Sequence, residues 1–223
     1  MGDRLDTAAR YTGTDMSTQA KPFLTPEQYL EIERAAEYKS EYFNGEMFAM
    51  AGGTLDHAMI ASDVSGILRA QLRGRPCRIA GSDLRLQVSP DGLYTYPDIV
   101  VFCGKAKLAD AHRDTITDAT AIIEVLSPST ENYDRGFKFE QYRGLPSLKD
   151  YVVLAQNRVH VEHWTRQTDG SWNLRETSDP DAVIQLPSIE CSFRVGEAYE
   201  RVDIEAGERS PGVSGRNDSD LRF

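Results

Sequence analysis

The sequence of 223 residues is poor in cysteine: it contains only Cys77, Cys103 and Cys191 and no C-x-x-C pair. Their odd number and wide spacing argue against a disulfide framework and a cysteine zinc site, and they favour a reducing compartment. The chain also lacks an apolar run of the roughly 18 residues that a membrane span requires, and its start has no apolar stretch typical of a signal peptide. We therefore expect a soluble, cytoplasmic protein with no membrane partner.

Positive charge is in short supply. The chain has 25 lysines and arginines against 35 aspartates and glutamates, which gives a net charge of −10. An acidic chain repels the nucleic-acid backbone, so a nucleic-acid role requires a local basic patch or bound cations. Two modest basic clusters are present, and each is read either as a solvated helix face or as a phosphate-tracking rim: Arg69, Arg73, Arg75 and Arg78, and Arg135, Lys138 and Arg143.

Motifs for nucleotide cofactors and zinc are missing as well, since no P-loop, G-x-G-x-x-G or zinc-finger pattern occurs. The 40% of hydrophobic residues is enough for a packed core. Composition predicts a disordered N-terminal arm over 1–20, one domain over 21–205, and a disordered C-terminal tail over 206–223 that is rich in Gly, Ser and charge.

The N-terminal third predicts a helix, a hairpin and a second helix. Thr25-Pro26-Glu27-Gln28 is a capping box with proline at the first helical position. Asn44-Gly45 between two short alternating runs is typical of a two-residue β-turn. Apolar residues then recur at helical spacing from about Leu55 to Arg73, and Gly74 ends the pattern.

Several strands follow. The stretch 98–102 is nearly all apolar after its first residue, as is 119–126, and two such runs indicate central strands buried on both faces. A helix is expected from about Pro128 to Arg143, and further strands beyond it. The predicted fold class is α/β or α+β: a mixed central sheet flanked by helices, with an N-terminal helix-hairpin-helix segment.

Two carboxylates interrupt the apolar strands. Asp98 stands at the start of one run, and Glu124 lies inside the other. A buried carboxylate is costly unless it is paired, protonated or bound to a metal. A salt bridge at the end of the sheet would explain one of them. Two on adjacent strands would lie close enough to call for a cation, either Lys138 on the next helix or a divalent ion such as Mg²⁺ or Mn²⁺, which prefer oxygen ligands.

Three stretches carry a family resemblance: Tyr96-Pro97-Asp98-Ile99-Val100-Val101, Ile123-Glu124-Val125-Leu126-Ser127-Pro128-Ser129-Thr130, and Asp134-x-x-x-Lys138-x-x-x-Tyr142. With the upstream Asn44-Gly45-Glu46, His57 and Gly81-Ser82-Asp83-Leu84, in that order, they resemble the Uma-type putative restriction endonuclease family. That family belongs to the PD-(D/E)XK nuclease superfamily, whose fold is restriction-endonuclease-like. The resemblance runs from about Pro22 to Glu200.

The resemblance implies a Mg²⁺- or Mn²⁺-dependent endonuclease that acts on DNA, leaves 5′-phosphate and 3′-hydroxyl ends, and is compatible with a homodimer. Asp98 and Glu124 would bind the metal together with the backbone carbonyl of Val125, and Lys138 would be the catalytic lysine. The superfamily's E-x-K pattern has lysine two residues after the glutamate, where this chain has Leu126. Within the family the lysine comes from the following helix.

Three further residues are accessory candidates, each with a plainer alternative. Glu46 is a metal ligand or base, or an exposed hairpin glutamate. His57 contacts phosphate or transfers a proton, or its ring is satisfied by local backbone. Tyr142 lies one helical turn after Lys138 and orients it or contacts a phosphate, or it packs in the core.

Two other functions remain open. One is a non-catalytic nucleic-acid-binding or interaction protein that retains the nuclease fold, with Asp98, Glu124 and Lys138 sealed in a buried ion network. The other is a Mg²⁺-dependent hydrolase of small phosphoesters, which a closed pocket would favour. Convergence of the three side chains on an open cleft would favour the endonuclease.

Overall fold

The computed structural model describes residues 23–128 and 130–204. The predicted arm over 1–20 and tail over 206–223 lie outside the described residues and stay predictions. Among the described residues, no helix combines the length and apolar character needed to cross a bilayer.

The described residues begin with a capped helix and a β-hairpin. In α1 (Pro26–Ala35) the Thr25 backbone N–H donates to Gln28 Oε1 at 2.9 Å, and the Gln28 N–H donates to Thr25 Oγ1 at 3.3 Å, so the predicted capping box is confirmed. β1 (Ser40–Phe43) and β2 (Glu46–Ala49) pair antiparallel across Asn44 and Gly45, whose φ angles of 46° and 85° are those of a type I′ turn.

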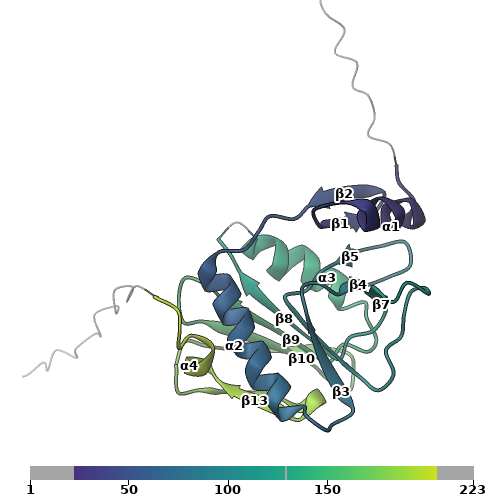
Figure 1. Cartoon of the computed structure of the whole chain (residues 1–223). Coiled ribbons are helices and arrows are strands. Elements are labelled where there is room, and N and C mark those ends of the chain that lie inside the picture. The colour runs from purple at the N-terminus through teal and green to yellow at the C-terminus, as the bar shows by residue number, and fades with distance from the viewer. Residues whose placement is uncertain (1–22, 129, 205–223) are drawn as a thin grey trace, which may run out of the picture.

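A long helix and a six-stranded mixed sheet form the body of the molecule (Figure 1). The helix is α2 (Leu55–Gln71). The strand order is β11-β10-β9-β8-β6-β3; β8 and β9 run parallel, and the other neighbours run antiparallel. The strands are β3 (Cys77–Gly81), β6 (Ile99–Cys103), β8 (Ala121–Leu126), β9 (Asp150–Ala155), β10 (Val161–Arg166) and β11 (Trp172–Thr177).

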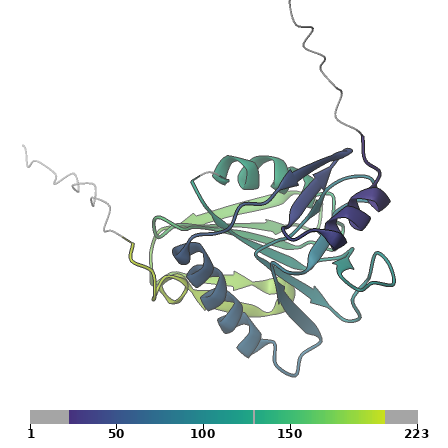
Figure 2. The ribbon, with the colours of Figure 1, turned by 45° about the horizontal axis from the view of Figure 1, so that its top comes forward.

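A second sheet joins the hairpin to the body, in the order β2-β1-β5-β4-β7 (Figure 2). Its further strands are β4 (Arg85–Gln87), β5 (Tyr94–Thr95) and β7 (Thr115–Ile116). The last described elements are a two-stranded ribbon, β12 (Val183–Leu186) and β13 (Cys191–Arg194), and the short helices η2 (Pro187–Ile189) and α4 (Val195–Ala198). The mixed sheet flanked by helices confirms the predicted fold class.

Alternation along β8 directs side chains to two different cores. Ile123 and Val125 pack with α2 and the β12–β13 ribbon on one face, while Ile122 and Leu126 pack with Tyr142 on the other. Glu124 has the parity of the second set. Its side chain therefore points to the face covered by the crossover helix between β8 and β9.

The crossover helix differs in type from the expected α-helix. Residues Tyr133–Lys138 form the π-helix η1, and α3 (Phe139–Tyr142) continues it. A sequence pattern does not separate these types, because side chains four residues apart remain neighbours in both.

The structure corrects the expectation that the cysteines are unpaired. Cys77 and Cys103 form a disulfide between β3 and β6, and Cys191 is free and buried. The pair is 26 residues apart in sequence, but the antiparallel register of β3 and β6 places the two residues directly opposite each other. That register is a tertiary feature and cannot be read from cysteine spacing.

Candidate active site

Asp98 and Glu124 meet where β6 and β8 lie side by side. The antiparallel register pairs Ile99 with Ile123. Asp98, which precedes Ile99, therefore lies opposite Glu124, which follows Ile123. The Asp98 N–H donates to Glu124 Oε2 at 2.9 Å, and the Val125 N–H donates to Asp98 Oδ2 at 2.8 Å. The pairing of the two strands thus fixes both carboxylates in place.

Glu124 is almost completely buried, with 3% of its side chain exposed. Burial, the largest cause, raises its pKa to about 8, and the negative charges of Asp98 and Asp134 act in the same direction, while Lys138 opposes them. The Tyr142 hydroxyl, fully buried behind Glu124, donates to Oε1 at 2.8 Å. Glu124 is thus a carboxylate whose ionised form lacks sufficient compensating positive charge.

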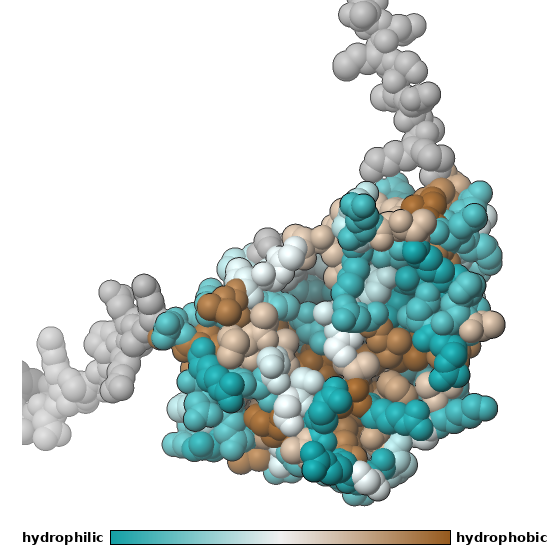
Figure 3. Space-filling model, viewed as in Figure 1, coloured by the Kyte–Doolittle hydropathy of each residue, from teal (hydrophilic) through white to brown (hydrophobic). Residues whose placement is uncertain are grey.

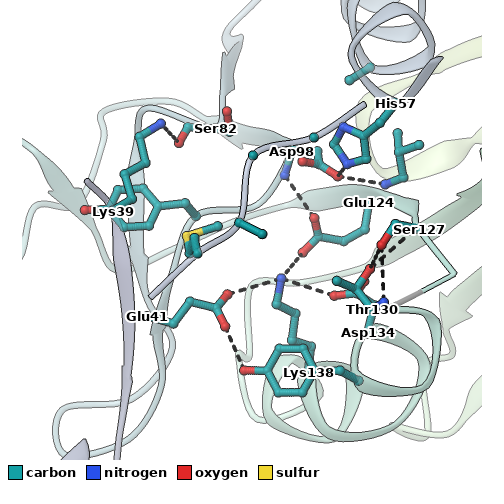
Figure 4. Close-up of a pocket in the computed structure, with 18 of the residues that line it drawn as sticks. Lys39, Glu41, His57, Ser82, Asp98, Glu124, Ser127, Thr130, Asp134 and Lys138 are labelled. Atoms are coloured by element: carbon teal, nitrogen blue, oxygen red, sulfur yellow. Dashed lines mark hydrogen bonds and ion pairs between the residues drawn. The ribbon is translucent and has the colours of Figure 1, made fainter. Parts of the chain in front are cut away.

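Lys138 contacts three carboxylates (Figure 4). Its Nζ lies 3.2 Å from Glu41 Oε1, 3.4 Å from Glu124 Oε1 and 3.2 Å from Asp134 Oδ1, one π-helical turn earlier. Burial, the largest single effect, lowers the pKa of Lys138. The interactions with Glu124, the Tyr142 hydroxyl, Glu41 and Asp134 together outweigh burial and raise this pKa well above its usual value. The side chain therefore remains an ammonium.

Glu41 is the residue that the sequence analysis missed. It lies on β1 with its side chain buried, and besides Lys138 it accepts hydrogen bonds from the Tyr133 hydroxyl at 2.8 Å and from Thr95 Oγ1. The residues on either side of it, Ser40 and Tyr42, are buried as well. Because the strand shows no alternation of exposed and buried positions, no sequence pattern marks Glu41 as inward-facing.

His57 lies in the first turn of α2 and faces Asp98. Its backbone N–H donates to Oγ1 of the N-cap residue Thr54 at 3.2 Å, and its ring Nε2 is 3.1 Å from Asp98 Oδ2. The hydrogen bond to Asp98 is the largest cause that raises the pKa of His57, against the effect of burial. The ring is therefore engaged by the carboxylate and not by local backbone.

One cavity of about 1420 Å³ is bordered by His57, Lys138 and the four carboxylates. We call the carboxylates and the lysine the acidic site: Glu41, Asp98, Glu124, Asp134 and Lys138. It lies between the β1–β2 hairpin, the start of α2, the end of β8 and η1, and Figure 3 shows a recess between the hairpin lobe and the body that carries α2. Asp98 and His57 have 18% and 20% of their side chains exposed, against 8% for Lys138. Solvent thus reaches the acidic site from the side of Asp98 and His57.

Two of the predicted features lie away from the cavity. Glu46 is exposed on β2 and is not among the lining residues. Arg69, in the last turn of α2, lies about 18 Å along the helix axis from His57, and Arg75 is paired with Glu190. The second cluster is partly engaged too, because Arg135 binds Glu131 and Glu162. Neither cluster forms a rim around the site.

The acidic site has the charge and the ligand chemistry to hold a divalent cation. Three carboxylates contact the Lys138 ammonium, and Asp98 adds a fourth beside Glu124. These carboxylates and the wall residue Val125 offer oxygen atoms of the kind that Mg²⁺ and Mn²⁺ prefer. Within the described part of the chain, the one group of three His, Cys, Asp or Glu side chains whose ligand atoms all lie within 4.8 Å of one another is a different one, which lies outside the cavity lining: His160, Glu162 and Glu176.

Comparison with known proteins agrees with this architecture. The model of the family described as "Uma2: Putative restriction endonuclease" matches residues 26–196. Two proteins of Synechocystis sp., slr1290 and sll1609, are 37% and 33% identical to this chain; the alignments cover 80% and 73% of it and 92% of each relative. The crystal structure of an Anabaena variabilis protein, described as a putative nuclease belonging to DUF820, matches with a TM-score of 0.64 at 19% identity, over 79% of this chain and 98% of that one.

Proposed function

Because this chain belongs to the Uma2 family of putative restriction endonucleases, we propose that it is a divalent-metal-dependent endonuclease that hydrolyses DNA phosphodiester bonds at the acidic site. The observation that carries the proposal is the meeting of Asp98, Glu124 and Lys138 at the wall of one cavity. A metal site that borders open space is what hydrolysis of a polymeric phosphodiester requires.

Asp98 and Glu124 would hold the ion, with the backbone carbonyl of Val125 as a third ligand. Excess negative charge supports this assignment, because the raised pKa of Glu124 reports a carboxylate that a divalent cation would stabilise. Bound there, Mg²⁺ or Mn²⁺ would supply Lewis acidity toward a phosphate oxygen and lower the pKa of a coordinated water.

The protein's own groups would divide the remaining work. Lys138 cannot act as a base because it keeps its proton, so its part is a fixed positive charge opposite the charge that develops on phosphorus. Tyr142 and Glu41 position Glu124 and Lys138 through the contacts described above. His57, on the open side of Asp98, is the group placed to accept or return a proton.

The reaction consumes one water per bond. An oxygen–phosphorus bond forms to the water oxygen, the bond from phosphorus to the 3′ oxygen breaks, and one hydrogen of the water ends on the released 3′-hydroxyl. The other proton leaves with the 5′-phosphate or passes to solvent. Cleavage of two strands would use two sites, and a homodimer would supply the second.

One observation favours the non-catalytic alternative. Glu124 and Lys138 are 2% and 6% exposed, as members of a purely structural ion network would be. Only Asp98 and His57 connect that network to the cavity at appreciable exposure. The test must therefore distinguish a loss of catalysis at the site from a loss of the folded structure.

Plasmid nicking with purified full-length protein provides that test. We expect nicking in Mg²⁺ or Mn²⁺, none in EDTA, and a rate at least about a hundredfold lower in Asp98→Ala, with the melting temperature nearly unchanged. Glu176→Ala is the matched control, since it removes a carboxylate of the other ligand group. Nicking at the wild-type rate in Asp98→Ala would contradict the assignment of the active site to Asp98. Loss of nicking in Glu176→Ala would instead assign the metal site to the group of His160, Glu162 and Glu176.

A further inference from the structure

The cavity beside the acidic site has an apolar wall. The β1–β2 hairpin and the residues that follow it contribute Phe43, Phe48, Ala49, Met50 and Ala51. Across from them, Phe137 packs edge-on against Phe43 at a ring distance of 4.7 Å and stacks with Tyr133 at 5.3 Å. A wall of this kind offers contact area to flat, weakly polar groups and little to phosphates.

Phe48 is the most available of these rings. It lies on β2, an edge strand of the five-stranded sheet, and remains 45% exposed although it lines the cavity. An exposed aromatic ring on the wall of a cavity is a surface on which a nucleic-acid base can stack.

Free positive charge is scarce around the same cavity. Its basic lining residues are Lys39, His57 and Lys138. Lys138 is surrounded by carboxylates, His57 binds Asp98, and Lys39 Nζ lies 2.5 Å from Asp83 Oδ1 and 2.9 Å from the Ser82 carbonyl oxygen. A protein that binds duplex DNA through about six to ten phosphate contacts needs a matching set of Lys and Arg side chains. The lining of this cavity does not supply that many positive charges.

We infer that the site takes a short unpaired DNA segment, in which a base next to the scissile phosphate stacks on Phe48 and packs against the apolar wall. This inference rests on the proposed nuclease function and adds the substrate class to it. The cavity of about 1420 Å³ exceeds the 300–1,000 Å³ that is common for small-ligand pockets, and an unpaired strand brings one or two phosphates to the site instead of a duplex groove.

The first test compares one sequence as a single strand, as a duplex, and as a duplex with a short unpaired bubble, each with Mg²⁺ at 50 and 200 mM salt. We expect cleavage of the single strand and within the bubble, with kcat/KM at least tenfold above that of the duplex. Two phosphate contacts predict a loss of affinity of about sevenfold over this salt range. Preference for the duplex, or a loss of a thousandfold, would overturn the inference and leave the nuclease assignment standing.

The second test is a matched pair of phenylalanine substitutions, one on the β1–β2 hairpin and one just before α1. Phe48→Leu removes the ring from the cavity wall, while Phe23→Leu changes a ring that is 71% exposed and outside the lining. We expect Phe48→Leu to raise KM for the single strand at least fivefold with little change in kcat, and Phe23→Leu to change neither. Equal effects of the two variants would contradict the assigned role of Phe48.

A binding measurement separates failure of this inference from failure of the proposed function. An oligonucleotide with 2-aminopurine beside a methylenephosphonate linkage, which cannot be hydrolysed at that bond, reports stacking by loss of fluorescence. Quenching by wild type and not by Phe48→Leu supports the inference even if no DNA is cleaved. No quenching by wild type overturns it even if plasmid is nicked.

Discussion

Asp98 and Glu124 each accept a hydrogen bond from the backbone of the strand that carries the other. The Asp98 N–H donates to Glu124, and the Val125 N–H donates to Asp98. Because these donors belong to paired strands, the relative position of the two carboxylates follows from the β6–β8 register. The site is therefore built into the central sheet, and a substitution that keeps the sheet intact can remove the charge without displacing its neighbours.

Lys138→Met should destabilise the fold by about 3–5 kcal/mol. It leaves Glu41, Glu124 and Asp134 buried without their shared counter-charge, and such a loss is costly because the remaining charges stay desolvated. Urea unfolding at pH 7 measures the effect.

The same variant also reports on the cation. If a divalent ion binds among these carboxylates, 10 mM Mg²⁺ should raise the melting temperature of Lys138→Met more than that of wild type, since the ion replaces the lost positive charge. An equal or smaller rise in the variant would count against a cation site here.

Tyr142→Phe and Tyr151→Phe should separate stability from metal binding. Each removes a buried hydroxyl donor, to Glu124 Oε1 at 2.8 Å and to the Asp134 carbonyl oxygen at 3.1 Å, respectively. Both variants should lose about 1 kcal/mol of unfolding free energy. Only Tyr142→Phe should weaken Mn²⁺ binding, because only that hydroxyl orients a proposed ligand. Equal metal affinity in the two variants would remove Tyr142 from the site.

The anchoring of α1 should depend on pH. Arg34 Nε and Nη2 bind Asp114 at 2.7 and 2.9 Å, and this hydrogen bonding, the largest cause, holds the pKa of Asp114 well below its usual range, although burial opposes it. A carboxylate with a lowered folded-state pKa contributes stability above its unfolded pKa of about 4, and this contribution disappears as the pH falls through the folded value.

The melting temperature of Arg34→Met should therefore lie furthest below wild type near pH 7, and the gap should close as the pH falls from 4 toward 2. Arg194→Met is the control, since its partner Asp181 is 83% exposed and 3.4 Å away and the pair should contribute little at any pH. A gap for Arg34→Met that is constant from pH 7 to pH 2 would show that the pair does not anchor α1.

Much of the local structure could be predicted from the sequence because its signals are local. The capping box at Thr25 and the Asn44-Gly45 turn depend on residues within one turn of each other, and both are present. The apolar runs around Asp98 and Glu124 became the neighbouring strands β6 and β8. The family resemblance is confirmed by the match over 26–196.

The remaining features depend on contacts between distant segments. Glu41 reaches Lys138 only because the hairpin packs over η1, and Cys77 meets Cys103 only through strand register. The strands β5 and β7 have two residues each, too few to show a period. Arg69 lies in the last turn of the helix whose first turn carries His57, and Arg73 follows that helix, so a basic cluster in the sequence did not become a basic rim at the site.

Calorimetric titration of Mn²⁺ into wild type, Glu124→Gln and Glu176→Gln decides whether the metal site lies at Asp98 and Glu124. Glu124→Gln keeps the shape of a side chain that is 3% exposed and removes a carboxylate oxygen that would bind the ion, and Glu176→Gln makes the same change in the His160 group. We expect one site per chain in wild type and Glu176→Gln, with affinity lowered at least about tenfold in Glu124→Gln. Unchanged binding in Glu124→Gln together with loss in Glu176→Gln would contradict it.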